Sequence, residues 1–256
     1  MTVHASGPHD LSEAYVRDLI ALALSKALPP GSKTTMVTTD PMTKTRAIST
    51  LKNGQLAGFV LNIAGQVDDE ALVKINLPTF LGASDYRICF GRAALRGALA
   101  EVKTVDDLKP FSFAHALGWA DTPVMRANGL KVIEVQRIDS IFRMMSIDRV
   151  DLFCRNLIEV LFELDAAPPG VVVMDGFLLK YPAPHYLHVH VRDRALADLL
   201  QQGLLAAVRD GSAPRLLKRY LLPSSKRFDL KHRRVIPLTG GYEYSRESLP
   251  KLDFLP

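Results

Sequence analysis

No run of apolar residues in this 256-residue chain approaches the roughly 18 that a membrane-spanning helix needs. A strong excess of charge is also missing, since the formal net charge is only +5. The basic residues are scattered, apart from one concentration that we interpret as a solvated segment near the C-terminus: Lys226, Arg227, Lys231, His232, Arg233 and Arg234. The sequence shows no known nucleic-acid-binding motif, so no nucleic-acid partner is expected.

The motifs of several large enzyme classes are missing as well. The sequence contains no Gly-x-Ser-x-Gly, no phosphate-loop glycine pattern and no His-Glu-x-x-His. Asp68, Asp69 and Glu70 form an acidic cluster, but adjacent carboxylates on a turn are usually solvated. We therefore expect a protein that is not an enzyme and needs no cofactor.

Cysteine is scarce, with only Cys89 and Cys154 in the chain. They lack the spacing of zinc ligands and lie in apolar runs, so buried free thiols are expected rather than a zinc site. A disulfide would suit an oxidising compartment, but the sequence leaves open whether the two sulfurs meet. His188 and His190 alternate along an expected strand after His185 without an acidic or cysteine partner, which favours half-exposed histidines over metal ligands.

The length permits two sizeable cores, and the hydrophobic pattern of the first part alternates strands with helices. The first helix is expected to start at Asp10, with Glu13 completing a capping box, and to end before Pro29. Strands are expected at 3–5, 34–39 and 55–62, and a second helix at 43–51. This β-α-β-α-β order predicts a parallel sheet covered by helices.

The alternation continues in the rest of the chain. Strands are expected at 86–90, 111–114, 131–135, 150–154 and 186–191, and helical segments at 104–108, 123–127, 140–147, 156–164, 196–208 and 214–221. Thr122 is a candidate N-cap with Pro123 at the first helical position, and Asn128 and Gly129 end that helix. The prolines between residues 181 and 185 predict a stiff extended connector.

Several spaced segments carry a resemblance to a known family. Residues 102–109 read VKTVDDLK, close to the V-K-S-L-D-D-L-K of that family, and further matches lie at 45–56, 126–132, 149–151 and 208–220. In these segments the chain resembles extracellular solute-binding proteins of the amino-acid type, which have the type II periplasmic-binding fold. Residues 118–122 and 155–159 are similar to a subgroup of bacterial transporter-associated binding proteins.

The resemblance implies an α/β protein of two lobes, each a parallel or mixed sheet flanked by helices. Two crossing strands, near 80–85 and 181–186, would join them. Lobe 1 would be discontinuous, comprising 1–82 and 186–256, and lobe 2 would comprise 83–185. A monomer of this kind captures a small-molecule ligand in the cleft between its lobes and delivers it to the permease of an ABC-type membrane transporter.

The cellular location is also implied by this resemblance. A periplasmic protein is implied, and since no secretion signal precedes the first expected strand, we presume that a signal peptide has been removed, with a natural cytosolic form as the alternative. Two other functions stay open on this fold: a dehydratase-like enzyme and the ligand-sensing domain of a receptor kinase.

The candidate ligand-binding residues are those near the ends of expected strands, where open α/β sheets bind ligands. They are Arg46, Asn62, Trp119, Asp121, Thr122, Arg155, Asn156, Glu159, Tyr181 and Tyr186. The Arg155 guanidinium could grip a carboxylate or phosphate, although an ion pair with Glu159 four residues on is equally expected. Trp119 could stack on a ligand beside the helix start at Thr122, or simply anchor the surface of its lobe. Arg46 is either a ligand contact or a solvated helix arginine.

The expected polarity of the site departs from the family pattern. Amino-acid binders of the family commonly carry an Arg after the third strand, which clamps the ligand carboxylate, and an Asp that receives its ammonium group. Here the acidic residues 68–70 occupy the first position, and Arg155 and Asn156 occupy the second. These departures predict weak or no binding of the common α-amino acids. They favour a small polar ligand with an anionic or strongly hydrogen-bonding group near Arg155 and Thr122.

Overall fold

The computed structural model describes residues 1–5, 11–40, 42–65, 67, 69–247, 249–253 and 255. The chain divides into two compact units. Unit 1 comprises Met1–Leu81, Pro184–Tyr220 and Arg246–Lys251, and unit 2 comprises Gly82–Ala183, Leu221–Ser245 and Leu252–Pro256. None of the helices formed by the described residues is long and apolar enough to cross a membrane.

Unit 1 is built on a five-stranded mixed sheet with the order β2-β1-β3-β11-β4. Its strands are β1 (Thr2–Ala5), β2 (Thr35–Thr38), β3 (Phe59–Ala64), β4 (Leu72–Lys74) and β11 (His185–His190). Its helices are α1 (Leu11–Ala27), α2 (Lys44–Lys52), the short η4 (Val191–Asp193), α7 (Arg194–Arg209) and the first part of α8 (Ser212–Arg227). Strand β1 pairs in parallel with β2 and β3, which confirms the parallel arrangement predicted for this part of the chain. Strand β11 then runs antiparallel between β3 and β4.

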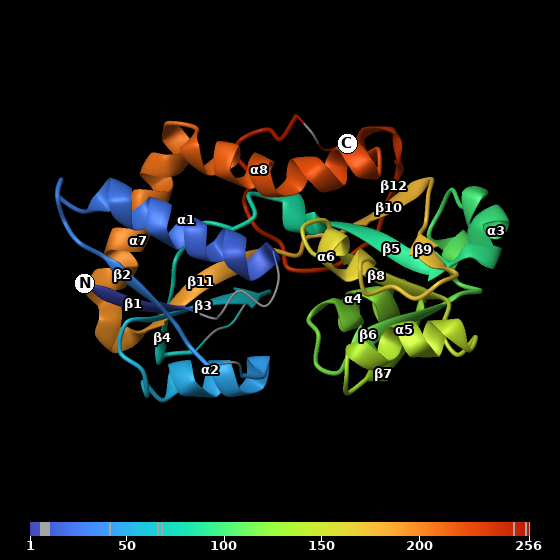
Figure 1. Cartoon of the computed structure of the whole chain (residues 1–256), viewed down its shortest axis with the longest axis horizontal. Helices are drawn as coiled ribbons and strands as arrows, with labels where there is room; N and C mark the ends of the chain where they lie inside the picture. Colours follow the sequence, from blue (N-terminus) through green and yellow to red (C-terminus); the bar gives the residue numbers. More distant parts are fainter. Residues whose placement is uncertain are drawn as a thin grey trace. The chain divides into compact units, whose positions relative to one another are not determined.

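Helices cover both faces of this sheet, with α1 and α7 on one side and α2 on the other (Figure 1). Ala47 and Leu51 of α2 pack on Phe59, Leu61 and Ile63 of β3. On the other side, α7 approaches α1 so closely that a Cβ on Gly203 would lie 1.9 Å from the carbonyl oxygen of Ala23. Only glycine permits this contact between the two helix backbones.

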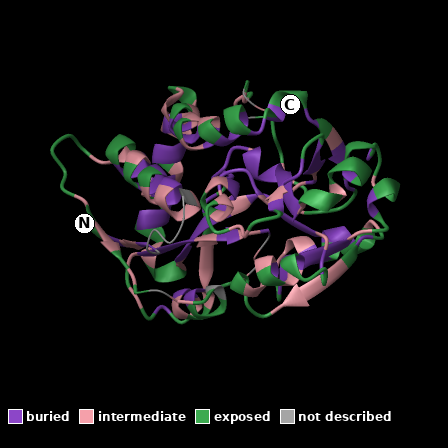
Figure 2. Cartoon of the chain, turned by 45° about the vertical axis from the view of Figure 1, so that its right-hand side comes forward, coloured by how far each residue is buried: buried purple, intermediate pink, exposed green. Residues whose placement is uncertain are grey.

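Unit 2 is built on a seven-stranded mixed sheet with the order β12-β10-β5-β8-β6-β7, and β9 also pairs with β5. Its strands are β5 (Tyr86–Arg92), β6 (Ser112–Ala116), β7 (Lys131–Val135), β8 (Leu152–Asn156), β9 (Val171–Val173), β10 (Phe177–Lys180) and β12 (Arg234–Pro237). Its helical segments are η1 (Ala83–Asp85), η2 (Ala93–Leu95), α3 (Arg96–Ala100), η3 (Asp106–Leu108), α4 (Asp121–Ala127), α5 (Asp139–Ser146), α6 (Val160–Leu164) and η5 (Leu230–His232). Buried residues concentrate on the central strands, and exposed residues lie mainly on helices and loops (Figure 2).

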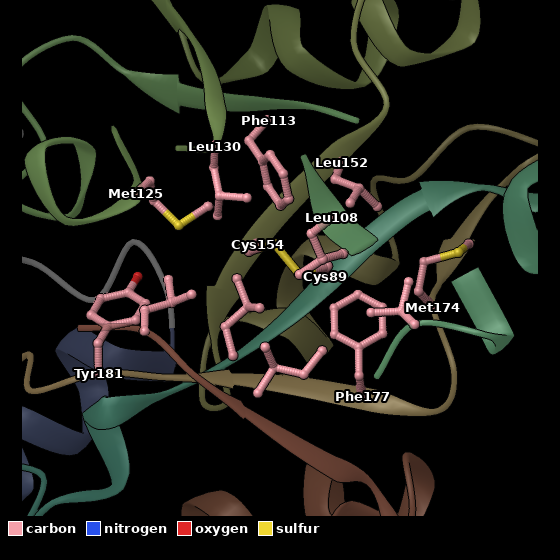
Figure 3. Packing of buried hydrophobic residues seen from close by; sticks show 14 of the residues in the cluster. Cys89, Leu108, Phe113, Met125, Leu130, Leu152, Cys154, Met174, Phe177 and Tyr181 are labelled. Carbon is pink, nitrogen blue, oxygen red and sulfur yellow. A yellow bond between two sulfur atoms is a disulfide. The ribbon is translucent and has the colours of Figure 1, made fainter. Parts of the chain in front are cut away.

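The core of unit 2 contains a disulfide. Cys89 of β5 and Cys154 of β8 are directly opposite each other in the antiparallel ladder, and their sulfurs are bonded (Figure 3). Both residues are buried, with exposures of 1% and 4%, but they form a disulfide rather than the free thiols expected from the sequence. Phe113, Leu152 and Phe177 belong to the same apolar cluster. The disulfide thus joins the two central strands of the sheet inside its core.

Two expected helix starts were wrong. Helix α4 begins at Asp121 and has no side-chain cap, because the hydroxyl of Thr122 lies 3.0 Å from the Nδ1 atom of His115 instead. The helix expected at 156–164 begins only at Val160, because Asn156 still belongs to β8. The predicted cap at Asp10 lies outside the described residues.

The C-terminal part of the chain also differs from the expectation. Residues 186–256 were expected to belong to lobe 1 together with residues 1–82, whereas Leu221–Ser245 and Leu252–Pro256 belong to unit 2. The reason is β12, which pairs in parallel with β10. Within the basic concentration, Arg233 is buried rather than solvated, and its guanidinium donates to the carbonyl groups of Phe228 and Met174.

Candidate functional site

One edge of the sheet in unit 2 brings together residues that are far apart in the sequence. Strands β6, β7 and β8 run in parallel, so their carboxyl ends share this edge. Strand β5 runs the other way, and its register places Arg87 opposite Asn156. Strand β10 is antiparallel to β5 and ends at the same edge, just before Tyr181. Carboxyl-end edges are where open α/β sheets bind ligands.

Asp121 and Tyr181, two of the predicted site residues, meet at this edge around Arg87. The Nε atom of Arg87 donates to Oδ2 of Asp121 over 2.9 Å, and its Nη2 atom lies 2.9 Å from the same oxygen. The hydroxyl of Tyr181 donates to this oxygen over 2.9 Å as well. Arg87 is only 4% exposed, and its Nη1 atom donates to the carbonyl of Ser84.

Asp121 is ionised at neutral pH. Burial by itself would raise the pKa of this carboxyl group. The charge of Arg87 and the hydrogen bonds from Arg87 and Tyr181 outweigh burial and hold the pKa below its ordinary value. Burial would likewise lower the pKa of Arg87, but the neighbouring Asp121 carboxylate raises it. The pair is therefore a salt bridge between charged groups.

Arg155 and Glu159, also predicted site residues, form a second charged group. The Nε atom of Arg155 donates to both carboxylate oxygens of Glu163, over 2.7 and 2.8 Å, and its Nη2 atom lies 3.1 Å from Glu159. The predicted Arg155–Glu159 ion pair is thereby confirmed, although Arg155 lies on a strand rather than on the same helix. Two carboxylates already compensate its charge, which favours a neutral hydrogen-bonding group over a third anion as its ligand contact.

Trp119 lies beside Arg155. The guanidinium carbon of Arg155 is 4.6 Å from the centre of the Trp119 ring, a cation–π contact. Phe153 stacks on the same indole at 6.1 Å, and the His115 ring is 5.5 Å away. Trp119 is half-buried, so part of the residue remains accessible to solvent.

Thr122 and Asn156 are buried at 3% and 6% exposure, and their polar groups serve unit 2 itself. Thr122 contacts His115, and the side-chain oxygen of Asn156 accepts a hydrogen bond from the backbone N–H of Ile158 over 3.2 Å. These two residues therefore stabilise the loops that carry the accessible groups.

The candidates of unit 1 do not form a comparable group. Asn62 accepts a hydrogen bond from the Thr79 hydroxyl over 3.1 Å, and Tyr186 is buried with the Lys74 ammonium 4.8 Å from its ring centre. Arg46 is exposed on α2. In the acidic segment, Asp69 forms an ion pair with Lys52, and Asp68 lies outside the described residues.

The strand histidines correct another expectation. His188 is fully buried rather than half-exposed, with Nδ1 3.0 Å from the carbonyl oxygen of Tyr186. His190 is partly exposed and accepts a hydrogen bond from the backbone N–H of Arg192. The described part of the chain contains no group of three metal-ligating side chains that could hold an ion.

Burial of His188 and His115 predicts a loss of stability on mild acidification. Desolvation lowers the pKa of each to about 4, whereas the unfolded chain titrates near 6.5. As the pH falls from 6.5 towards 4, the unfolded state takes up protons that the folded state refuses, so stability decreases. At pH 5 each histidine lowers the free energy of unfolding by up to about 2 kcal/mol.

Urea unfolding at pH 7 and pH 5 measures this dependence. His188→Gln and His115→Gln should each reduce it. His232→Gln is the matched control, because that side chain is 79% exposed. If neither His188→Gln nor His115→Gln changes the difference in stability between pH 7 and pH 5, the two histidines are not its cause.

Sequence reasoning missed three members of this edge: Arg87, His115 and Glu163. Arg87 had a detectable signal, since it is a charged residue within the otherwise apolar run that becomes β5. A buried arginine requires a partner, so such a position points to an ion pair. Its partner, Asp121, follows β6, and the sequence does not specify the strand order β5-β8-β6 that brings the two residues to one edge.

No family model matches the sequence, and no curated protein does. Solved structures with the same fold exist at low sequence identity. An ancestral arginine-binding protein bound to arginine has a TM-score of 0.57 and 20% identity, covering 86% of this chain and 97% of that one. The probable amino-acid ABC transporter extracellular-binding protein ytmK from Bacillus subtilis has a TM-score of 0.63 and 14% identity, covering 86% and 97%.

A third similar structure is the ancestral amino acid-binding protein AncCDT-1, described as a precursor of cyclohexadienyl dehydratase. It has a TM-score of 0.58 and 16% identity, covering 86% of this chain and 95% of that one. Together these likenesses establish the fold. The chain is an α/β protein with two mixed sheets flanked by helices, and it has the type II periplasmic-binding fold expected from its sequence.

Proposed function

We propose that this chain is a periplasmic solute-binding protein that captures a small polar ligand and delivers it to an ABC-type membrane transporter. The observation that carries the proposal is the charged edge of unit 2. Trp119, Asp121 and Arg155 are each fixed by neighbours and each remain partly accessible, with the last two side chains 19% and 12% exposed. Groups held in place before a ligand arrives cost little to order on binding, which is what a tight binding site requires.

Two further points support this role. Proteins that share the fold are described as transporter-associated binding proteins and as binding arginine. The disulfide of unit 2 agrees with an oxidising compartment such as the periplasm. Arg155 pairs with Glu159 and Glu163, and we assign to its guanidinium a further hydrogen bond to a neutral acceptor of the ligand.

A ligand screen tests the proposal. Trp119 is the single tryptophan of the chain, so its fluorescence reports directly on the proposed site. We expect one chemical class among a broad panel of amino acids, amines, amides, sugars and organic acids to change this fluorescence at a one-to-one ratio, with calorimetry giving the affinity. Mass spectrometry of the panel after incubation should show no new product. Product formation would favour a dehydratase-like enzyme, and a panel without any binder would refute the proposal.

Arg155→Ala should weaken binding of the ligand found in this screen by roughly ten- to a hundredfold, because a hydrogen bond from a charged donor is worth about 1.5–3 kcal/mol. Trp119→Ala should weaken it with less salt dependence, because a stacking contact is not screened by ions. The control is Arg137→Ala, which removes an arginine of unit 2 whose side chain is 79% exposed. Calorimetry showing the same affinity for Arg155→Ala and the parent would remove Arg155 from the site.

A further inference from the structure

The two carboxylate oxygens of Asp121 differ sharply in their surroundings. All three donors that reach this side chain, two from Arg87 and one from Tyr181, meet at Oδ2. The other oxygen, Oδ1, accepts no hydrogen bond from the described residues, and it is not among their buried atoms that lack a partner. The side chain is 19% exposed, so Oδ1 is an accessible oxygen of Asp121 that is not engaged by Arg87 or Tyr181.

The charges of this edge do not balance. Asp121, Glu159 and Glu163 supply three negative charges, whereas Arg87 and Arg155 supply two positive ones. Arg155 pairs with both glutamates, and Arg87 is the arginine that pairs with Asp121, through one of its oxygens. An accessible, partly desolvated oxygen with surplus negative charge favours a positively charged donor.

Resting on the proposed function, we propose that Oδ1 of Asp121 accepts a hydrogen bond from a protonated nitrogen of the ligand, and that Arg87 and Tyr181 are positioning residues for it. The ligand class is thus a small molecule that carries an ammonium, amidinium or guanidinium group. The planar fork of Arg87 fixes the carboxylate through Nε and Nη2, and Tyr181 holds the same oxygen from a different strand end. Together they turn Oδ1 outward.

Two near-isosteric probes test the sign of the charge. 4-Aminobutanamide and succinamate share an amide group and differ at the other end, which is an ammonium in the first and a carboxylate in the second. Calorimetry at millimolar concentration should detect 4-aminobutanamide and not succinamate. Asp121→Asn should weaken its binding more than tenfold. Asp106→Asn, which changes a carboxylate that is 73% exposed in the same unit, should not.

The outcomes separate this inference from the proposed function. Binding of succinamate alone, of both probes equally, or of neither overturns the inference, as does an Asp121→Asn variant with unchanged affinity. The proposed function stands or falls independently on the broad screen: a neutral or anionic ligand found there would support capture of a solute while refuting the role of Asp121.

A separate measurement tests the positioning role of Tyr181. Tyr181→Phe keeps the ring and removes one donor from Oδ2, so it should weaken 4-aminobutanamide roughly three- to tenfold at pH 7. The lost hydrogen bond also raises the pKa of Asp121, so binding should be lost at a higher pH on acidification than in the parent protein. A residue that only stabilised the fold would leave this pH midpoint in place. An unchanged midpoint in a folded Tyr181→Phe protein would overturn the assignment.

Discussion

Replacing both Cys89 and Cys154 by alanine should lower the free energy of unfolding by roughly 4 kcal/mol. The disulfide joins residues 65 apart in the sequence, and a cross-link of that length removes about this much conformational freedom from the unfolded chain. It also joins β5 and β8, the strands that carry Arg87 and Arg155. We therefore expect weaker binding of the ligand as well as lower stability.

Urea unfolding with and without a reductant separates the cross-link from the side chains. Reduction of the parent protein keeps both sulfur atoms and removes only the bond, so its unfolding midpoint should move most of the way to that of the double variant. The variant itself should not respond to the reductant. If the oxidised and reduced parent proteins unfold at the same urea concentration, the bond contributes nothing to stability.

Local patterns predicted most of the regular elements. The strand expected at 131–135 is β7 (Lys131–Val135), and the prolines after residue 28 follow the end of α1 at Ala27. Such elements are specified by nearby residues: an apolar run between turn residues, or a helix stopped by proline. The predicted α/β fold with two sheets rests on these signals and on the family resemblance.

Elements that depend on distant partners were missed. Strand β12 exists because it pairs with β10 from residue 177 onward, and its own sequence begins with arginine in a basic segment. Strands β4 and β9 have three residues each, too few for a visible alternation. These short strands are formed by their neighbours in the sheet rather than by local preference.

The residues of the candidate site also divide into those that local patterns predicted and those that depend on distant partners. Trp119, Asp121 and Arg155 follow or end strands, so the strand-end rule was sufficient to bring them to one edge. The partners of these residues were not predictable. Glu163 reaches Arg155 only through the turn before α6, and Arg87 reaches Asp121 only because β5 is antiparallel to β8. Sequence reasoning therefore placed these partly exposed groups at one edge and missed Arg87, the buried group that pairs with Asp121.

Arg87→Met should lower the free energy of unfolding at pH 7 by about 3–5 kcal/mol, which is typical when one partner of a buried ion pair is removed. Methionine keeps much of the apolar volume of the arginine side chain but leaves Asp121 charged, with Tyr181 as its remaining donor. Asp121→Asn in the same background removes that charge, so the double variant should recover part of the loss. Urea unfolding of the four proteins gives the coupling between the two residues. Arg137→Met is the control, since an exposed pair contributes at most about 1 kcal/mol.

The pH dependence of this penalty identifies its cause. In the parent protein, Arg87 holds the pKa of Asp121 low, but in Arg87→Met burial acts without this ion pair and the pKa of Asp121 rises relative to the parent. A group whose folded pKa is raised gains stability as the pH falls, because the folded state then binds the additional proton. The gap between Arg87→Met and the parent should therefore narrow as the pH is lowered from 7 to 4.5. A gap that stays constant over this range would mean that the loss comes from packing around Arg87 and not from the unpaired charge of Asp121.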